Sequence, residues 1–93
     1  MNIITKIRNG DVDEAELLEC VTSNDIELVL AVSSSEFATP AILRIAAWDN
    51  DDQVRLAVAR NKNTNDETIR LLCNDKNIEI ANTAKEELIR RNL

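Results

Sequence analysis

Apolar residues recur along this chain in a pattern that repeats every 26 residues without a gap. Leu17, Leu43 and Ile69 occupy one set of equivalent positions. The apolar positions around them follow the spacing i, i+3, i+4, which is typical of one buried face of an α-helix. The other equivalent sets are Cys20, Ala46 and Leu72; Val21, Ala47 and Cys73; Leu28, Val54 and Ile80; Ala31, Ala57 and Thr83; and Val32, Val58 and Ala84. A short two-helix unit of this kind must stack on its neighbours to bury its apolar face.

Residues that cap helix N-termini mark where each helix should begin, because their side chains accept hydrogen bonds from the first backbone amides. One set of equivalent caps is Asp13, Thr39 and Asn65, and a second is Asp25, Asp51 and Asn77. Pro40 follows Thr39, as expected for the first position of a helix. The pattern predicts helices over 14–22, 26–33, 40–48, 52–60, 66–74 and 78–91. Thr64 with Glu67 offers a capping box that would begin one helix a residue earlier.

The chain is therefore predicted to be a single all-α domain, a superhelical stack of three two-helix repeats closed by terminal caps. Ile3, Ile4 and Ile7 form a partial helical stripe that ends at Asn9-Gly10, which predicts an N-terminal cap. The last helix continues into a charged stretch that predicts a solvated C-terminal cap. The expected boundaries are 1–10 for the N-terminal cap, 11–36 for repeat 1, 37–62 for repeat 2, and 63–93 for repeat 3 with the C-terminal cap.

Composition agrees with closely packed helices and narrows the classes of partner. Aromatic residues make up 2% of the 93 residues, so the core must be aliphatic. The formal net charge of −6 argues against binding to a nucleic-acid backbone and is compatible with a basic partner. No apolar run is long enough for a membrane helix, and no secretory signal is evident. The expectation is a cytoplasmic protein without bound cofactor.

The stretch Asp49-Asn-Asp-Asp-Gln-Val-Arg-Leu-Ala-Val-Ala-Arg-Asn61, followed by Lys-Asn-Thr64, resembles the leucine-rich repeat variant family and short HEAT-like repeats. Those families pair Asp-x-Asp-x-x-Val-Arg-x-Ala-Val-Ala-x-Asn with a Pro-x-Thr-Pro turn. Lys62 and Asn65 stand where the family has proline. The resemblance implies a right-handed α-α superhelix, in which one helix of each pair can be shortened to a 3₁₀-helix. It implies no activity, because such repeats are scaffolds with varied roles.

Few residues indicate catalysis or metal binding. The chain has no histidine, which removes the commonest general base and imidazole ligand. Cys20 and Cys73 occupy apolar positions, and core packing is favoured over a reactive thiol. Asp49, Asp51 and Asp52 form an acidic cluster whose spacing does not match a calcium loop. Helix capping is the favoured interpretation of this cluster, and metal or carboxylate chemistry is the alternative.

Trp48 is the main candidate for contact with a partner. Its equivalents Thr22 and Asn74 are polar, which suggests exposure, and tryptophan is strongly enriched in binding hot spots. The alternative is that its ring packs over the seam between repeats. Arg44 and Arg70 are equivalent to one another, so they either form a short ladder for acidic ligands or pair with acids of the chain. Asp49 completes the expected partner-binding set of Trp48, Arg44, Arg70 and Asp49.

These observations predict a non-catalytic protein-binding module that presents a rigid helical-repeat surface, as a monomer or weak oligomer. The alternative is a small acidic inhibitor or immunity protein that occupies a basic site on a nucleic-acid-processing enzyme. Steep salt dependence would favour the inhibitor. An enzyme is the least favoured class, since three short repeats offer little room for a pocket.

Overall fold

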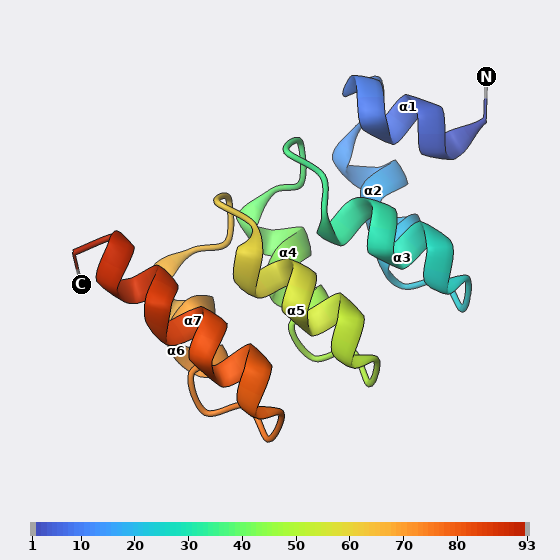
Figure 1. Cartoon of the computed structure of the whole chain (residues 1–93). Helices are drawn as coiled ribbons and strands as arrows, with labels where there is room; N and C mark the ends of the chain where they lie inside the picture. Colours follow the sequence, from blue (N-terminus) through green and yellow to red (C-terminus); the bar gives the residue numbers. More distant parts are fainter. Residues whose placement is uncertain (1, 93) are drawn as a thin grey trace.

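A computed structural model describes residues 2–92, and within this range the chain forms α-helices and no β-strand (Figure 1). The helices are α1 (Ile3–Asn9), α2 (Glu14–Val21), α3 (Ile26–Ser33), α4 (Pro40–Ala46), α5 (Asp52–Arg60), α6 (Asp66–Leu72) and α7 (Ile78–Arg90). The prediction of an all-α fold is therefore confirmed. Within residues 2–92, no helix combines the length and the apolar character needed to cross a lipid bilayer.

All six predicted caps lie at the N-termini of helices, where each side chain accepts a backbone hydrogen bond. Asp13 accepts from the Glu16 amide at 2.8 Å, and Glu16 accepts in return from the Asp13 amide at 3.2 Å. This reciprocal pair is a capping box. Positions that are 26 residues apart in the sequence thus also mark the starts of equivalent helices.

The alternative start at Thr64 is wrong. Asn65 caps α6 by accepting a hydrogen bond from the Thr68 amide at 2.8 Å. The hydroxyl of Thr64 is buried and donates instead to the Val58 carbonyl oxygen at 2.7 Å. Thr64 therefore belongs to the packed turn after α5, and it cannot also cap the next helix.

Helices α4 and α6 end two residues before their predicted ends. The Trp48 amide donates to Ile45 O at 3.2 Å and the Asp49 amide donates to Ala46 O at 3.1 Å, both with i→i−3 spacing. The equivalent amides of Asn74 and Asp75 do the same. Such 3₁₀-type bonds tighten the last turn of a helix. The second helix of each pair (α3, α5 and α7) is α-helical.

The core is aliphatic, as predicted. Leu17, Leu43 and Ile69 are 2%, 0% and 0% exposed, so all three equivalent positions are buried. Burying a side chain of this size contributes about 1.5–3 kcal/mol relative to leaving it in water. Val32, Val58 and Ala84 are also fully buried at equivalent positions.

The helices form two layers (Figure 1). Helices α3, α5 and α7 lie side by side in one layer, and α2, α4 and α6 lie behind them. Helix α1 packs against α3, and α1 and α7 lie at opposite ends of the arrangement (Figure 1). The principal extents are 38 × 24 × 16 Å, so the protein is elongated along the direction in which the pairs follow one another.

Gly10 joins α1 to the rest of the chain through a left-handed turn with φ of 77°. A Cβ atom at this position would lie 2.9 Å from the ring carbon Cε1 of Phe37. The backbone angle therefore favours glycine, and a side chain here would also require the Phe37 ring to shift. Lys6 of α1 adds an ion pair, with its Nζ 2.8 Å from Oε2 of Glu16.

Candidate binding surface

Helices α2, α4 and α6 carry exposed residues on the side that faces away from α3, α5 and α7. In α4, burial of Ile42, Leu43 and Ala46 leaves the opposite side in water because of the 3.6-residue helical period. We call the exposed positions on this side of the three helices, and of the turns that directly follow them, the outer face. The outer face comprises Ala15, Leu18, Glu19, Thr22, Ala41, Arg44, Ile45, Trp48, Glu67, Arg70, Leu71 and Asn74, which are all exposed.

Trp48 lies on the outer face with 71% of its surface exposed. It follows the end of α4, in the tight turn described above. This exposure leaves little of the ring packed over a seam between helix pairs, so the packing alternative is wrong. The binding role of Trp48 stays a prediction.

A hollow of about 450 Å³ lies between α4 and α6. We call it the α4–α6 hollow, and its lining residues are Arg44, Trp48, Glu67, Thr68, Arg70, Leu71 and Asn74. The closely packed helix pairs include α2 with α4 but not α4 with α6, which leaves this space open. Three of the four predicted partner-binding residues therefore meet at one depression.

Thr68 is the buried member of this lining, with 2% of its surface exposed. Its hydroxyl oxygen is the buried side-chain polar atom of residues 2–92 that has no hydrogen-bond partner. A buried hydroxyl without a partner carries a free-energy cost of about 1–3 kcal/mol. The carbonyl oxygen of Thr64, one helical turn earlier, is occupied by the guanidinium of Arg91 at 2.7 Å.

Arg44 and Arg70 are exposed and form no ion pair with any acidic residue of the range 2–92. The alternative that these two arginines pair with acids of the chain is thus not found in the described residues. Four other arginines do pair with acids: Arg55, Arg60, Arg90 and Arg91. Arg44 and Arg70 on the outer face, like Arg8 on α1, are therefore not used in ion pairs within residues 2–92.

Asp49 is beside Trp48, but its carboxylate has a structural role. Its Oδ1 accepts a hydrogen bond from the Asp51 amide at 2.8 Å, which shapes the turn before α5. The equivalent Ser23 and Asp75 accept in the same way from Asp25 and Asn77. Asp49 and Trp48 both line a second hollow of about 380 Å³ that adjoins the first at Leu71 and Asn74.

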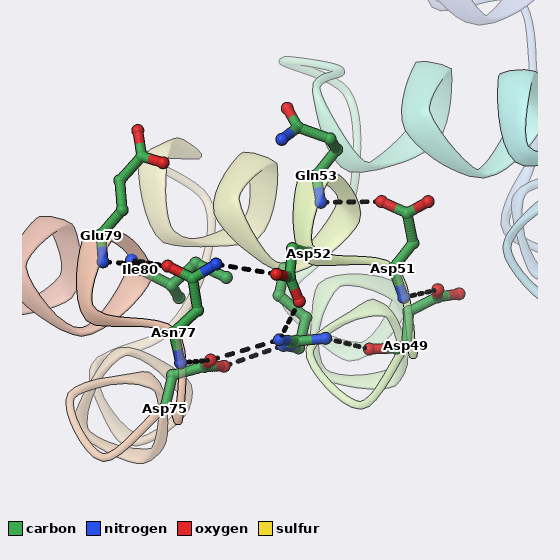
Figure 2. A network of polar contacts seen from close by, with 9 residues as sticks. Asp49, Asp51, Asp52, Gln53, Asp75, Asn77, Glu79 and Ile80 are labelled. Atoms are coloured by element: carbon green, nitrogen blue, oxygen red, sulfur yellow. Dashed lines mark hydrogen bonds and ion pairs between the residues drawn. The ribbon is translucent and has the colours of Figure 1, made fainter.

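Two residues that line this second hollow, Arg55 and Asp75, belong to a largely buried ion-pair network that was not predicted from the sequence (Figure 2). Arg55 donates to Oδ2 of Asp75 at 2.8 Å, to Oδ1 of Asp52 at 2.6 Å and to the Asp49 carbonyl oxygen at 2.8 Å. Asn77 also donates to Asp52, at 2.7 Å. The network joins α5 to the turn that precedes α7.

Hydrogen bonds from Arg55 lower the pKa of the Asp75 carboxyl group below its ordinary value of 3.8, against the opposing effect of burial. Asp52 also has a lowered pKa, because its carboxylate accepts hydrogen bonds from Asn77 and Arg55. Both carboxylates are therefore stabilised in their charged form. The sequence signal for the network was an arginine at a position where the equivalents, Val29 and Ala81, are apolar.

Comparisons of the chain with known protein families, curated proteins and solved structures found no match. The resemblance to leucine-rich repeat variants stays a prediction from the motif at residues 49–64.

The acidic cluster does not converge on one point. Asp49 accepts from a backbone amide, Asp51 caps α5 by accepting from the Gln53 amide at 2.7 Å, and Asp52 accepts from Arg55 and Asn77. No group of three or more acidic or cysteine side chains in residues 2–92 is arranged as a metal site. The capping interpretation of Asp51 is confirmed.

Cys20 is buried and Cys73 is partly buried, and both are free thiols. Burial raises the pKa of the Cys20 thiol, with further contributions from Glu19 and Glu16. A raised pKa keeps the thiol protonated and therefore poorly nucleophilic. Cys20 thus behaves as a core residue.

Proposed function

We propose that this chain is a non-catalytic protein-binding module, and that its helix pairs form a right-handed superhelix of three 26-residue repeats with a cap at each end. The equivalent helix caps and the equivalent buried positions support the repeat architecture. The observation that carries the function is the 71% exposure of Trp48 at the edge of the α4–α6 hollow.

A tryptophan on a fixed helix end is well suited to bind a protein surface. Its ring supplies a large contact area but has only two side-chain torsions to immobilise, so ordering it costs little entropy. Ile42, Leu43 and Ala46 anchor α4 in the core, so the ring is presented by a rigid element. Because this surface is preorganised, it loses little conformational entropy when a partner binds.

The size of the outer face is sufficient for a specific interface. A standard interface buries about 800 Å² on each partner. The two longer extents of the protein are 38 and 24 Å, so a broad side of the molecule can cover that area. Leu18, Ile45 and Leu71 add exposed apolar surface to that of Trp48, at 44%, 41% and 39% exposure.

The positions of the acidic residues support this proposal over an inhibitor that mimics a polyanion. Asp13, Asp25 and Asp51 are N-caps. Glu14, Glu16, Glu27, Asp52, Asp66, Glu67 and Glu79 lie in the first turns of helices. Acidic groups at these positions are stabilised by the helix dipole and by backbone amides. Much of the net charge of −6 is thus explained by helix formation.

A cytoplasmic location and a monomeric or weakly associating state are parts of the same proposal. The two cysteines are unpaired and mainly serve packing, which suits a reducing compartment. The non-catalytic assignment is supported by the absence of histidine from the sequence and by the structural use of the carboxylates near Trp48.

The proposal is tested by affinity capture from an extract of the source cell, with cross-linking and quantitative mass spectrometry. Trp48→Ala should lose the partners that the wild type recovers, while the fold stays intact. Ile78→Ala is the matched control because Ile78 is also 71% exposed but lies on α7. If Trp48→Ala and the wild type recover the same proteins in the same amounts, the outer face is not the binding surface.

A further inference from the structure

The charge of the α4–α6 hollow is opposite in sign to that of the whole chain. Its lining contains the guanidiniums of Arg44 and Arg70 and one carboxylate, that of Glu67. The net charge of the chain is −6. The adjoining hollow adds two cations, Arg55 and Lys76, and two carboxylates, Asp49 and Asp75, so it leaves this balance of charge unchanged.

The acidic groups of the adjoining hollow are already engaged inside the protein. Asp75 is held by Arg55 at 2.8 Å, and Asp49 accepts from the Asp51 amide at 2.8 Å. Neither carboxylate belongs to an ion pair with Arg44, Arg70 or Lys76 among residues 2–92. The cations around Trp48 therefore keep their capacity to bind an external anion.

The lining of the α4–α6 hollow also includes two apolar side chains, Trp48 and Leu71, on which an apolar side chain of a protein can pack. Trp48 and Leu71 line both hollows, and Leu71 is 39% exposed. The hydroxyl of Thr68, at the buried side of the α4–α6 hollow, has an unused hydrogen-bonding capacity. Guanidinium groups bind carboxylates through two parallel hydrogen bonds, a geometry that a lysine ammonium cannot reproduce.

From this arrangement we propose that the α4–α6 hollow binds an acidic segment of a partner protein. The inference rests on the proposed function and specifies its partner. Carboxylates of the segment pair with Arg44 and Arg70, and an apolar side chain between them packs on Trp48 and Leu71. A nucleic acid fits less well, because it needs an extended basic surface and this chain is acidic overall.

The test begins with a display library of random 12-residue peptides, selected on the full-length protein. Affinities of the enriched peptides are then measured by isothermal titration calorimetry. We expect enrichment of Asp and Glu on either side of an apolar residue. Arg44→Glu combined with Arg70→Glu should weaken these peptides by about tenfold or more, since like charges then face each other. The affinity should also fall as salt is raised, because exposed charges are screened. An acidic inhibitor on a basic partner would show the same fall, so the acidic sequence of the enriched peptides separates the two hypotheses.

A matched control variant has the same change of net charge, but at two positions outside the hollow. Arg8→Glu with Lys85→Glu alters two exposed cations on α1 and α7 and should leave the affinity within about twofold of the wild type. Glu67→Gln removes the acid that lines the hollow, and it should strengthen the binding of acidic peptides. Circular dichroism of each variant verifies that the helices are retained.

The outcomes separate this inference from the proposed function. Enrichment of basic or neutral peptides, or of single-stranded oligonucleotides in a parallel selection, overturns the acidic-segment inference. If such basic or neutral peptides are lost with Trp48→Ala, the protein-binding function stands although its partner is not acidic. If no enriched peptide is weakened by Trp48→Ala, the outer face and the acidic-segment inference both fail. The inference is also overturned if the Arg8→Glu, Lys85→Glu control weakens the binding of acidic peptides as much as the Arg44→Glu, Arg70→Glu variant does.

Discussion

Arg55 and Asp75 form a buried, two-point ion pair between parts of the chain that are 20 residues apart. Nε of Arg55 lies 2.8 Å from Oδ2 of Asp75, and Nη2 lies 3.2 Å from Oδ1. The two side chains are 7% and 6% exposed. Because Arg55 also binds the carbonyl oxygen of Asp49, it connects the turn after Trp48 with the turn after α6. The walls of both hollows are thereby fixed relative to each other.

Removal of Arg55 should destabilise the protein strongly. Arg55→Ala leaves Asp75 buried without its cation, and breaking a buried pair in this way costs about 3–5 kcal/mol. The free energy of unfolding is measured by urea denaturation. Arg60→Ala is the matched control on the same helix, since Arg60 and Glu79 are exposed and 3.9 Å apart. We expect the control to cost less than about 1 kcal/mol. Equal losses in both variants would show that the network does not hold the helices together.

Acid should weaken the protein through Asp75. Its pKa is lowered in the folded state, so folding favours the charged carboxylate. This contribution is fully present above the ordinary pKa of 3.8, which applies to the unfolded chain, and is lost as the pH falls through the lower folded pKa. Asp75→Asn removes the titrating group. The free energy of unfolding of this variant should therefore fall less than that of the wild type between about pH 5 and about pH 2. Parallel curves for wild type and variant would contradict this role of Asp75.

Asn61 should matter more to stability than Asn63, although both connect neighbouring turns. The Asn61 amide donates to Ser33 O at 3.0 Å and to Ser35 O at 2.9 Å in a buried site. Asn61→Ala leaves these carbonyl groups without their donor, at a cost of about 1–3 kcal/mol. Asn63 donates to Glu36 O and Ala38 O, nearer to water. Thermal unfolding should rank the variants accordingly, and the opposite ranking would show that burial does not decide the cost.

Gly10→Ala should destabilise the junction between α1 and α2. The left-handed angle of 77° is strained for alanine, and the new Cβ would lie 2.9 Å from the Phe37 ring. We expect a loss of more than about 1 kcal/mol in the free energy of unfolding. In a Phe37→Ala background the loss should be smaller, because the ring contact is gone and the backbone strain remains. A double-mutant cycle with no coupling between the two positions would show that the ring adapts freely.

The sequence was sufficient to place the starts of the six helices from α2 to α7, because caps and apolar spacing act within a few residues. Trp48 was also predictable as an exposed residue from its polar equivalents, Thr22 and Asn74. The partners of Arg55 could not be predicted, because its apolar equivalents do not indicate an ion pair with an acid 20 residues away. The α4–α6 hollow depends on the spacing of two helices, a tertiary property that periodicity does not determine.

The burial of several polar residues was also not predicted from the sequence. Ser35, Asn61 and Glu87 are equivalent under the 26-residue shift, and all three are buried. In the sequence they look like turn or surface residues. Their burial follows from the neighbouring turns, whose backbone carbonyl groups need donors: Asn61 supplies one, and Glu87 holds Arg91, which donates to the Thr64 carbonyl oxygen.

The exposure of Trp48 has a consequence for spectroscopy. The chain has one tryptophan and no tyrosine, so its near-ultraviolet fluorescence comes almost entirely from this residue. Since the indole is already 71% in water when the protein is folded, unfolding barely alters its emission wavelength. Denaturant titrations followed by the wavelength of maximum emission should therefore be nearly flat, while far-ultraviolet ellipticity reports the melting of the helices.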